Sequence, residues 1–214
     1  MAGDTGGVWA DVHLERGALV EDLNGLTPQQ WGVASLCAGW TVRDVVAHLA
    51  ATAVLTKRGF IGEFIRAGFS ADRIVQRQVT AGRDRDPSAL LAALRASVRS
   101  TASPPLPTIS RIVEIVVHGE DIRRPLGLHH TYSTDHIGAA VAYVAHDRLS
   151  GGSKRLTGLR LIGTDAAFVV GDGPAVEGPA VEGPAVSVLL AACGRRVALS
   201  ELSGPGVAEL GRRI

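Results

Sequence analysis

The segment Ile112-Val113-Glu114-Ile115-Val116-Val117-His118-Gly119 places two polar side chains inside an otherwise aliphatic stretch. Glu114 and His118 are four residues apart, about one helical turn, so both project from the same helix face. Burying a carboxylate and an imidazole among aliphatic groups is costly unless each has a partner. The spacing therefore predicts either a pair of metal ligands or a weak i,i+4 pair on a solvated stripe.

The helix that carries this pair is predicted to begin near Pro107-Thr108 and to run to about Arg123, before Pro125 and Gly127. Its apolar side chains cover roughly 200° of arc, about twice what an ordinary surface helix needs. Asp121 continues the polar stripe one turn after His118. We expect Asp121 either to orient an imidazole or to lie on the surface.

Earlier in the chain, the best-marked helix begins at Thr41, which forms a capping-box pattern with Asp44. Val42, Val45, Val46 and Leu49 fall at helical spacing, and His48 lies at the edge of that apolar face. This helix is predicted to run from residue 42 to about 58, with a broken extension to about 67. Apolar periodicity and helix-start signals predict further helices at residues 8–24, at Pro28–Trp31 after Thr27, after Asp86-Pro87, and from the cap Thr134 as far as Ser150.

The pattern changes after Gly152. Residues 159–162 and 167–170 predict two strands joined by a turn. Gly-Pro-Ala-Val at 173–176 is followed by two copies of Glu-Gly-Pro-Ala-Val, over residues 177–186, and we interpret this repeat as a duplicated loop ahead of a helix. A helix over Ala185–Ala192 is predicted to follow, with Pro184 at its start. The fold class is therefore α+β: a helical bundle over residues 1–150 and a small α/β domain over 155–214.

Composition argues against several classes of protein. The chain has 214 residues and a formal net charge of +1, which gives no electrostatic footprint for nucleic acid or an anionic membrane. No apolar run approaches the roughly 18 residues that span a bilayer, and the N-terminus lacks a signal pattern, so a cytoplasmic location is expected. Cys37 and Cys193 lack CxxC spacing, which argues against a disulfide scaffold or a thiolate zinc site. Cys37 has apolar neighbours and is expected to be a structural thiol.

His48 is the natural third partner of Glu114 and His118, because the three residues occupy the two best-marked helices of the bundle. Bundle cores build metal sites from side chains on facing helices. Two imidazoles and one carboxylate are the ligand set of open catalytic zinc sites. A lone histidine beside an apolar face is more often a packing residue, and that alternative stays open.

Three blocks of sequence carry a resemblance to a known family. Leu36–Leu49 (LCAGWTVRDVVAHL) resembles the signature of the mycothiol-dependent maleylpyruvate isomerase family, which belongs to the DinB/YfiT-like metal-binding bundles. Residues 114–127 are similar to its Glu-x-x-x-His-Gly-x-Asp-x-Arg segment, and residues 183–195 to the helix of its C-terminal domain. Ala38 departs from the family, which commonly has proline there, and the pentapeptide repeat resembles an insertion.

The resemblance implies an up-down four-helix bundle that holds a divalent metal, most often Zn2+, on His48, Glu114 and His118. It also implies a C-terminal domain like that of sterol-carrier proteins, which offers an arginine to the active-site cleft. Arg195 is the best match, and its neighbour Arg196 is the alternative.

The implied function is a mycothiol-dependent enzyme that isomerises, or transfers sulfur to, a small electrophilic substrate. Arg195 would pair with a substrate carboxylate, and Arg43 and Arg123 are further candidates for that role. The expected partners are the substrate and the thiol, with no nucleic acid or membrane, in a monomer or homodimer. The alternatives are a non-catalytic, stress-related bundle that binds a metal or small molecule, and a purely structural bundle.

Overall fold

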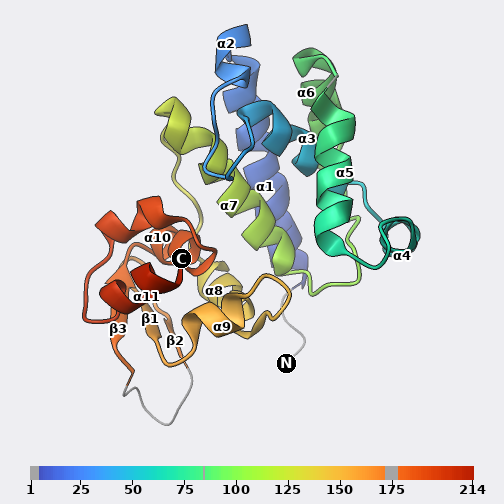
Figure 1. The fold of residues 1–214 in the computed structure, drawn as a ribbon. Coiled ribbons are helices and arrows are strands. Elements are labelled where there is room, and N and C mark those ends of the chain that lie inside the picture. The colour runs from blue at the N-terminus through green and yellow to red at the C-terminus, as the bar shows by residue number, and fades with distance from the viewer. Residues whose placement is uncertain (1–4, 84, 172–177) are drawn as a thin grey trace. The chain divides into compact units, whose positions relative to one another are not determined.

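The computed structural model describes residues 5–83, 85–171 and 178–214. The chain forms two compact units, Met1–Thr131 and Tyr132–Ile214. The first is helical and the second contains a small sheet (Figure 1). The sequence predicts domains over residues 1–150 and 155–214, with a boundary about one helix after the boundary between these two units. The predicted domains stay a prediction.

The first unit is built around a helical bundle in which α1 packs against α6 and α7, and α3 packs against α5, α6 and α7. Its core is aliphatic and includes Val12, Leu19, Val46 and Leu94, all fully buried. The predicted fold class is confirmed. The helices of this unit are α1 (Thr5–Asn24), α2 (Pro28–Trp31), α3 (Val42–Thr52), α4 (Lys57–Arg66), α5 (Ala71–Arg83), α6 (Pro87–Ala96), α7 (Ser110–Arg123) and the 3-10 turn η1 (Arg124–Leu126).

The start of α3 is fixed by the capping box that the sequence predicts. The Thr41 side chain accepts a hydrogen bond from the Asp44 backbone N–H, and Asp44 Oδ2 accepts one from the Thr41 N–H at 2.9 Å. The predicted length is wrong, because α3 ends at Thr52 rather than near residue 58. Thr56 caps the separate helix α4 by accepting from the Gly59 N–H.

Helix α5 lies in a stretch for which the sequence analysis predicts no helix. Its buried residues Ile74, Val79 and Gly82 fall on one helix face, and polar residues separate them along the chain. On this face the helix approaches α3 closely: a Cβ placed on Gly82 would lie 2.2 Å from the Ala47 Cβ. This contact leaves no room for a side chain at residue 82.

The second unit places α10 beside α8 and the sheet. The sheet has the order β2-β1-β3, with β1 antiparallel to β2 and parallel to β3. Leu161 of β1 pairs with Val170 on one side and with Val181 on the other. The elements of this unit are α8 (Ile137–His146), α9 (Gly152–Leu156), β1 (Arg160–Gly163), β2 (Val169–Val170), β3 (Ala180–Gly183), α10 (Ala185–Ala192), the 3-10 segment η2 (Arg196–Glu201) and α11 (Val207–Arg213).

Two local predictions in this unit are wrong. Thr134 does not cap α8, because its N-cap is His136, which makes no side-chain capping hydrogen bond. The repeat is not purely a loop, since Ala180 and Val181 are buried in β3 and pair with β1. The earlier part of the repeat, residues 173–177, lies outside the described residues. The helix predicted over Ala185–Ala192 is confirmed.

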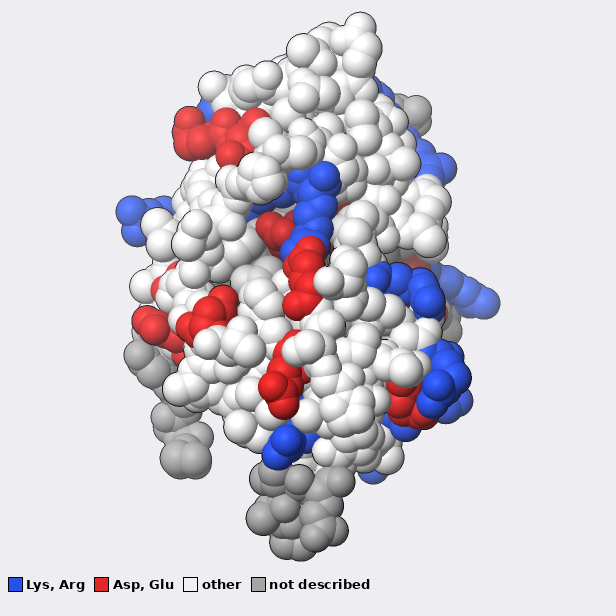
Figure 2. Space-filling model, turned by 90° about the vertical axis from the view of Figure 1, so that its left-hand side faces the viewer, with Lys and Arg blue, Asp and Glu red and all other residues white. Residues whose placement is uncertain are grey.

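The described helices include none that is both long and apolar enough to cross a bilayer. On the face shown in Figure 2, acidic and basic side chains are interspersed rather than gathered by sign. This mixture agrees with the near-zero net charge of the sequence.

Candidate metal centre

His48 is a buried residue of α3, with 7% of its surface exposed. Its Nδ1 lies 3.1 Å from Gln78 Oε1 on α5, and its ring contacts the edge of Trp40. Burial lowers the pKa of His48 to about 4, and the charge of His118 acts in the same direction. His48 is therefore neutral near pH 7, which is the form that binds a metal.

The His118 ring, on α7, lies next to that of His48. Their centroids are 5.0 Å apart and their planes cross at 79°. Two imidazoles on one tetrahedral zinc, with Zn–N bonds of about 2.0–2.1 Å, place their centroids about 5 Å apart. The spacing of His48 and His118 therefore fits two ligands of one metal ion.

Glu114 is paired with a buried arginine one turn earlier on α7. Arg111 Nη1 lies 3.1 Å from Oε1 and 3.0 Å from Oε2 of Glu114, and the two side chains are only 6% and 11% exposed. Burial raises the pKa of Glu114, but the positive charge of Arg111, with that of protonated His48 and His118, outweighs burial and holds this pKa below its usual value. Glu114 is thus an ionised carboxylate, and the alternative of a solvated surface pair is wrong.

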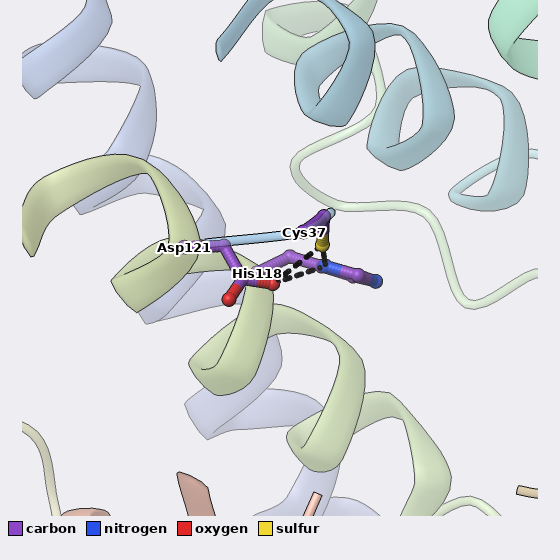
Figure 3. A group of neighbouring side chains, drawn as sticks. All are labelled: Cys37, His118 and Asp121. Atoms are coloured by element: carbon purple, nitrogen blue, oxygen red, sulfur yellow. Dashed lines mark hydrogen bonds and ion pairs between the residues drawn. The ribbon is translucent and has the colours of Figure 1, made fainter. Parts of the chain in front are cut away.

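Asp121 supplies the contact that orients His118. It is fully buried, and its Oδ2 lies 2.9 Å from His118 Nδ1 (Figure 3). A carboxylate that accepts from Nδ1–H leaves Nε2 as the nitrogen that can bind a metal. The alternative that Asp121 is a surface residue is wrong, and the predicted hydrogen bond to an imidazole is present.

Cys37 joins this contact from the loop before α3. Its thiol lies 3.0 Å from Asp121 Oδ2 and 3.7 Å from His118 Nδ1 (Figure 3). The sequence offered no signal for it, because no spacing rule connects residues 81 positions apart. Cys37, a loop residue, thus contacts the site that the sequence predicts from residues of α3 and α7.

Cys37, His118 and Asp121 form a group whose candidate ligand atoms all lie within 4.8 Å of one another, and His48 and Glu114 are not part of that group. Two of its separations, 2.9 and 3.0 Å, are hydrogen-bond distances. Sulfur, nitrogen and oxygen ligands of tetrahedral zinc lie about 3.3–3.6 Å apart, given the usual bond lengths. We therefore interpret the trio as a hydrogen-bonded network and keep it as the competing ligand set.

The candidate arginines differ in what they contact. Arg123 is buried and forms an ion pair with Asp22 at 2.7 Å, so its role is structural, within the bundle. Arg43, near the start of α3, is half-buried and donates to the Arg83 carbonyl. In the second unit, Arg196 donates to the Gly211 carbonyl in α11.

Arg195 is half-buried and donates to the Cys193 carbonyl at 2.9 Å. That contact lies two residues away, in the turn that follows α10, so it neither supports nor excludes a substrate role. The assignment of Arg195 to a substrate carboxylate stays a prediction.

Comparison with known proteins supports the resemblance of the first residue block, Leu36–Leu49. Residues 12–105 match the family model of the mycothiol maleylpyruvate isomerase N-terminal domain. The chain is similar to the crystal structure of the mycothiol-dependent maleylpyruvate isomerase, with a TM-score of 0.68 and 16% identity over 94% of this chain and 92% of that one. A histidine-to-alanine variant of that isomerase gives the same TM-score and coverage at 15% identity. No curated protein sequence matches the chain. The structural likeness shows a shared fold.

Proposed function

Because the chain resembles the mycothiol-dependent maleylpyruvate isomerase family in its N-terminal sequence and in its fold, we propose that it is a thiol-dependent isomerase of small electrophilic acids. Mycothiol is the proposed cosubstrate, and a divalent metal, zinc, the proposed cofactor. The observation that supports a metal most directly is the 5.0 Å separation of the His48 and His118 rings.

His48, Glu114 and His118 would hold the metal, and Asp121 would keep His118 in the tautomer that presents Nε2. When bound, such a metal would hold the cosubstrate thiol as a thiolate, the nucleophilic form. Arg111 neutralises Glu114 in the metal-free protein, so binding requires the carboxylate to turn from the guanidinium or to share it. Burial of these side chains favours this role, because water competes poorly at a desolvated site.

The thiol chemistry suits a substrate with a double bond conjugated to a carbonyl group. Addition of sulfur to one alkene carbon forms a C–S bond and leaves a C–C single bond that rotates. Elimination of the same thiol restores the double bond in the other geometry, so no atom or electron is gained or lost. Arg195 is the residue proposed to bind the substrate carboxylate through its planar guanidinium.

Metal content tests the ligand assignment. We expect about one divalent ion per wild-type chain and none in a His48→Ala, His118→Ala double variant. Cys37→Ala is the matched control, because it removes the thiol of the competing trio and leaves both imidazoles. Loss of metal in Cys37→Ala with full retention in His48→Ala would contradict the assignment in favour of Cys37, His118 and Asp121.

Turnover with mycothiol separates catalysis from metal sequestration. We expect thiol-dependent cis–trans isomerisation of maleylpyruvate or a related unsaturated keto acid, with Arg195→Ala raising KM and Arg196→Ala leaving it nearly unchanged. Stoichiometric metal without turnover on any such acid would favour the non-catalytic, metal-binding alternative.

A further inference from the structure

We infer that Gln78 is a positioning residue for His48: its side-chain oxygen accepts a hydrogen bond from Nδ1–H and so leaves Nε2 free to bind a metal. The Nδ1 to Oε1 distance is 3.1 Å. This inference rests on the proposed function in assigning a metal to His48. The hydrogen bond itself is independent of that assignment.

The backbone around Gln78 is held in place by two further contacts between α3 and α5. Gly82, one turn after Gln78, lies against Ala47, the residue before His48. Arg83 Nε donates to Asp44 Oδ1 at 3.1 Å, at the capped start of α3. These two contacts fix α5 against α3 and thereby hold the Gln78 amide beside His48. A glutamine on a mobile surface segment would not be held in this way.

The two imidazoles consequently have matching arrangements with different acceptors. His118 Nδ1 faces the Asp121 carboxylate, whereas His48 Nδ1 faces a neutral amide. Histidines that bind metals usually donate their second ring N–H to an oxygen acceptor, which fixes the tautomer and the ring orientation. Gln78 supplies for His48 what Asp121 supplies for His118.

Gln78 can be replaced without opening a hole in the core. It is half-buried and lines a cavity of about 330 Å³ together with residues of α3 and α4. Gln78→Leu removes the acceptor at similar size, and Gln78→Glu restores an oxygen acceptor. Gln76→Leu is the matched control, because Gln76 is an exposed glutamine on the same helix.

The first measurement is the tautomer of His48 in the metal-free protein, read from its nitrogen-15 chemical shifts by NMR. We expect the Nδ1–H form in wild type, Gln76→Leu and Gln78→Glu, and a mixture of tautomers in Gln78→Leu. A wild-type His48 that carries its proton on Nε2 would overturn the inference, since the amide would then be donating through its nitrogen.

The second measurement is Zn2+ affinity by competition with a chelator. We expect Gln78→Leu to weaken binding ten- to a hundredfold, as is usual for loss of such a partner, with Gln78→Glu close to wild type. Unchanged affinity and an unchanged tautomer in Gln78→Leu would overturn the inference. A wild type that binds no zinc would instead defeat the proposed function, and the tautomer of the metal-free protein would still decide the role of Gln78.

Discussion

At the scale of single residues, the site combines a histidine whose environment disfavours charge with a carboxylate whose environment favours it. Burial keeps His48 neutral, while Arg111 keeps Glu114 ionised. Both are the protonation states in which the side chains bind a metal. The protein thus presents metal-ready forms of both groups near pH 7.

Acid is predicted to destabilise the metal-free protein through His48. Its pKa is about 4 when folded, against 6.5 when exposed, so between these values the unfolded chain binds a proton that the folded chain does not. Unfolding free energy therefore falls as the pH drops from 6.5 to 4, by at most about 3 kcal/mol. Urea unfolding of the metal-free protein at several pH values measures this slope.

The control compares His48→Gln with His129→Gln, which alters an exposed histidine. Only His48→Gln should flatten the dependence between pH 6.5 and 4. Equal slopes in the two variants would show that other groups account for the acid sensitivity.

The sequence was sufficient to predict the site residues that lie on the same helix. Glu114, His118 and Asp121 follow from turn-by-turn spacing, and His48 follows from placing two marked helices in one bundle. Gln78 and Cys37 reach the same imidazoles across different elements. No spacing rule records such contacts, so only the folded chain shows them.

At the scale of elements, α5 combines a polar composition with a close contact to α3. Ile74, Val79 and Gly82 lie buried on one face of it, and Gly82 lies against Ala47. Sequence reasoning missed this helix because its few apolar residues lie within a mainly polar segment. The same close approach brings Gln78 within reach of His48.

Gly82→Ala is predicted to destabilise the protein by about 1–3 kcal/mol, the usual cost of overpacking. Its methyl group would lie 2.2 Å from the Ala47 Cβ, so α5 must shift away from α3. Gly17→Ala is the matched control, because that α1 glycine has nothing within 4 Å of the added carbon. It should raise stability by up to about 1 kcal/mol. Thermal unfolding of both variants checks the difference, and equal destabilisation would contradict the close-packing explanation.

At the scale of the whole molecule, the class of fold could be predicted because helices such as α3 and α6 have apolar periods and capped starts. The sheet was harder to predict. Strands β1 and β2 have recognisable sequences, but β3 lies between Pro179 and Pro184 in a glycine-rich repeat. Its pairing with β1 decides its conformation, and no local pattern overrides the turn-like composition.

The repeat also sets the length of the connection from β2 to β3. These strands flank β1, so the connection crosses two strand spacings, about 9.5 Å. Val170 ends β2 and Ala180 begins β3, ten residues later, which allows about 34 Å of extended chain. Removing one five-residue copy restores Gly-Pro before the strand and leaves five steps, about 17 Å.

Deleting one copy is therefore predicted to leave β2 paired with β1 and to change the free energy of unfolding by less than about 1 kcal/mol. Adding a copy should cost less than about 1 kcal/mol, because loop entropy grows slowly with length. Chemical denaturation of the shortened and lengthened chains measures both. A much larger loss of stability on deletion than on addition would contradict this and show that the connection has a minimum length. The number of copies in this repeat can therefore change by one while Leu161 keeps its pairing with both neighbouring strands, so the segment tolerates a change of length that the strands beside it do not.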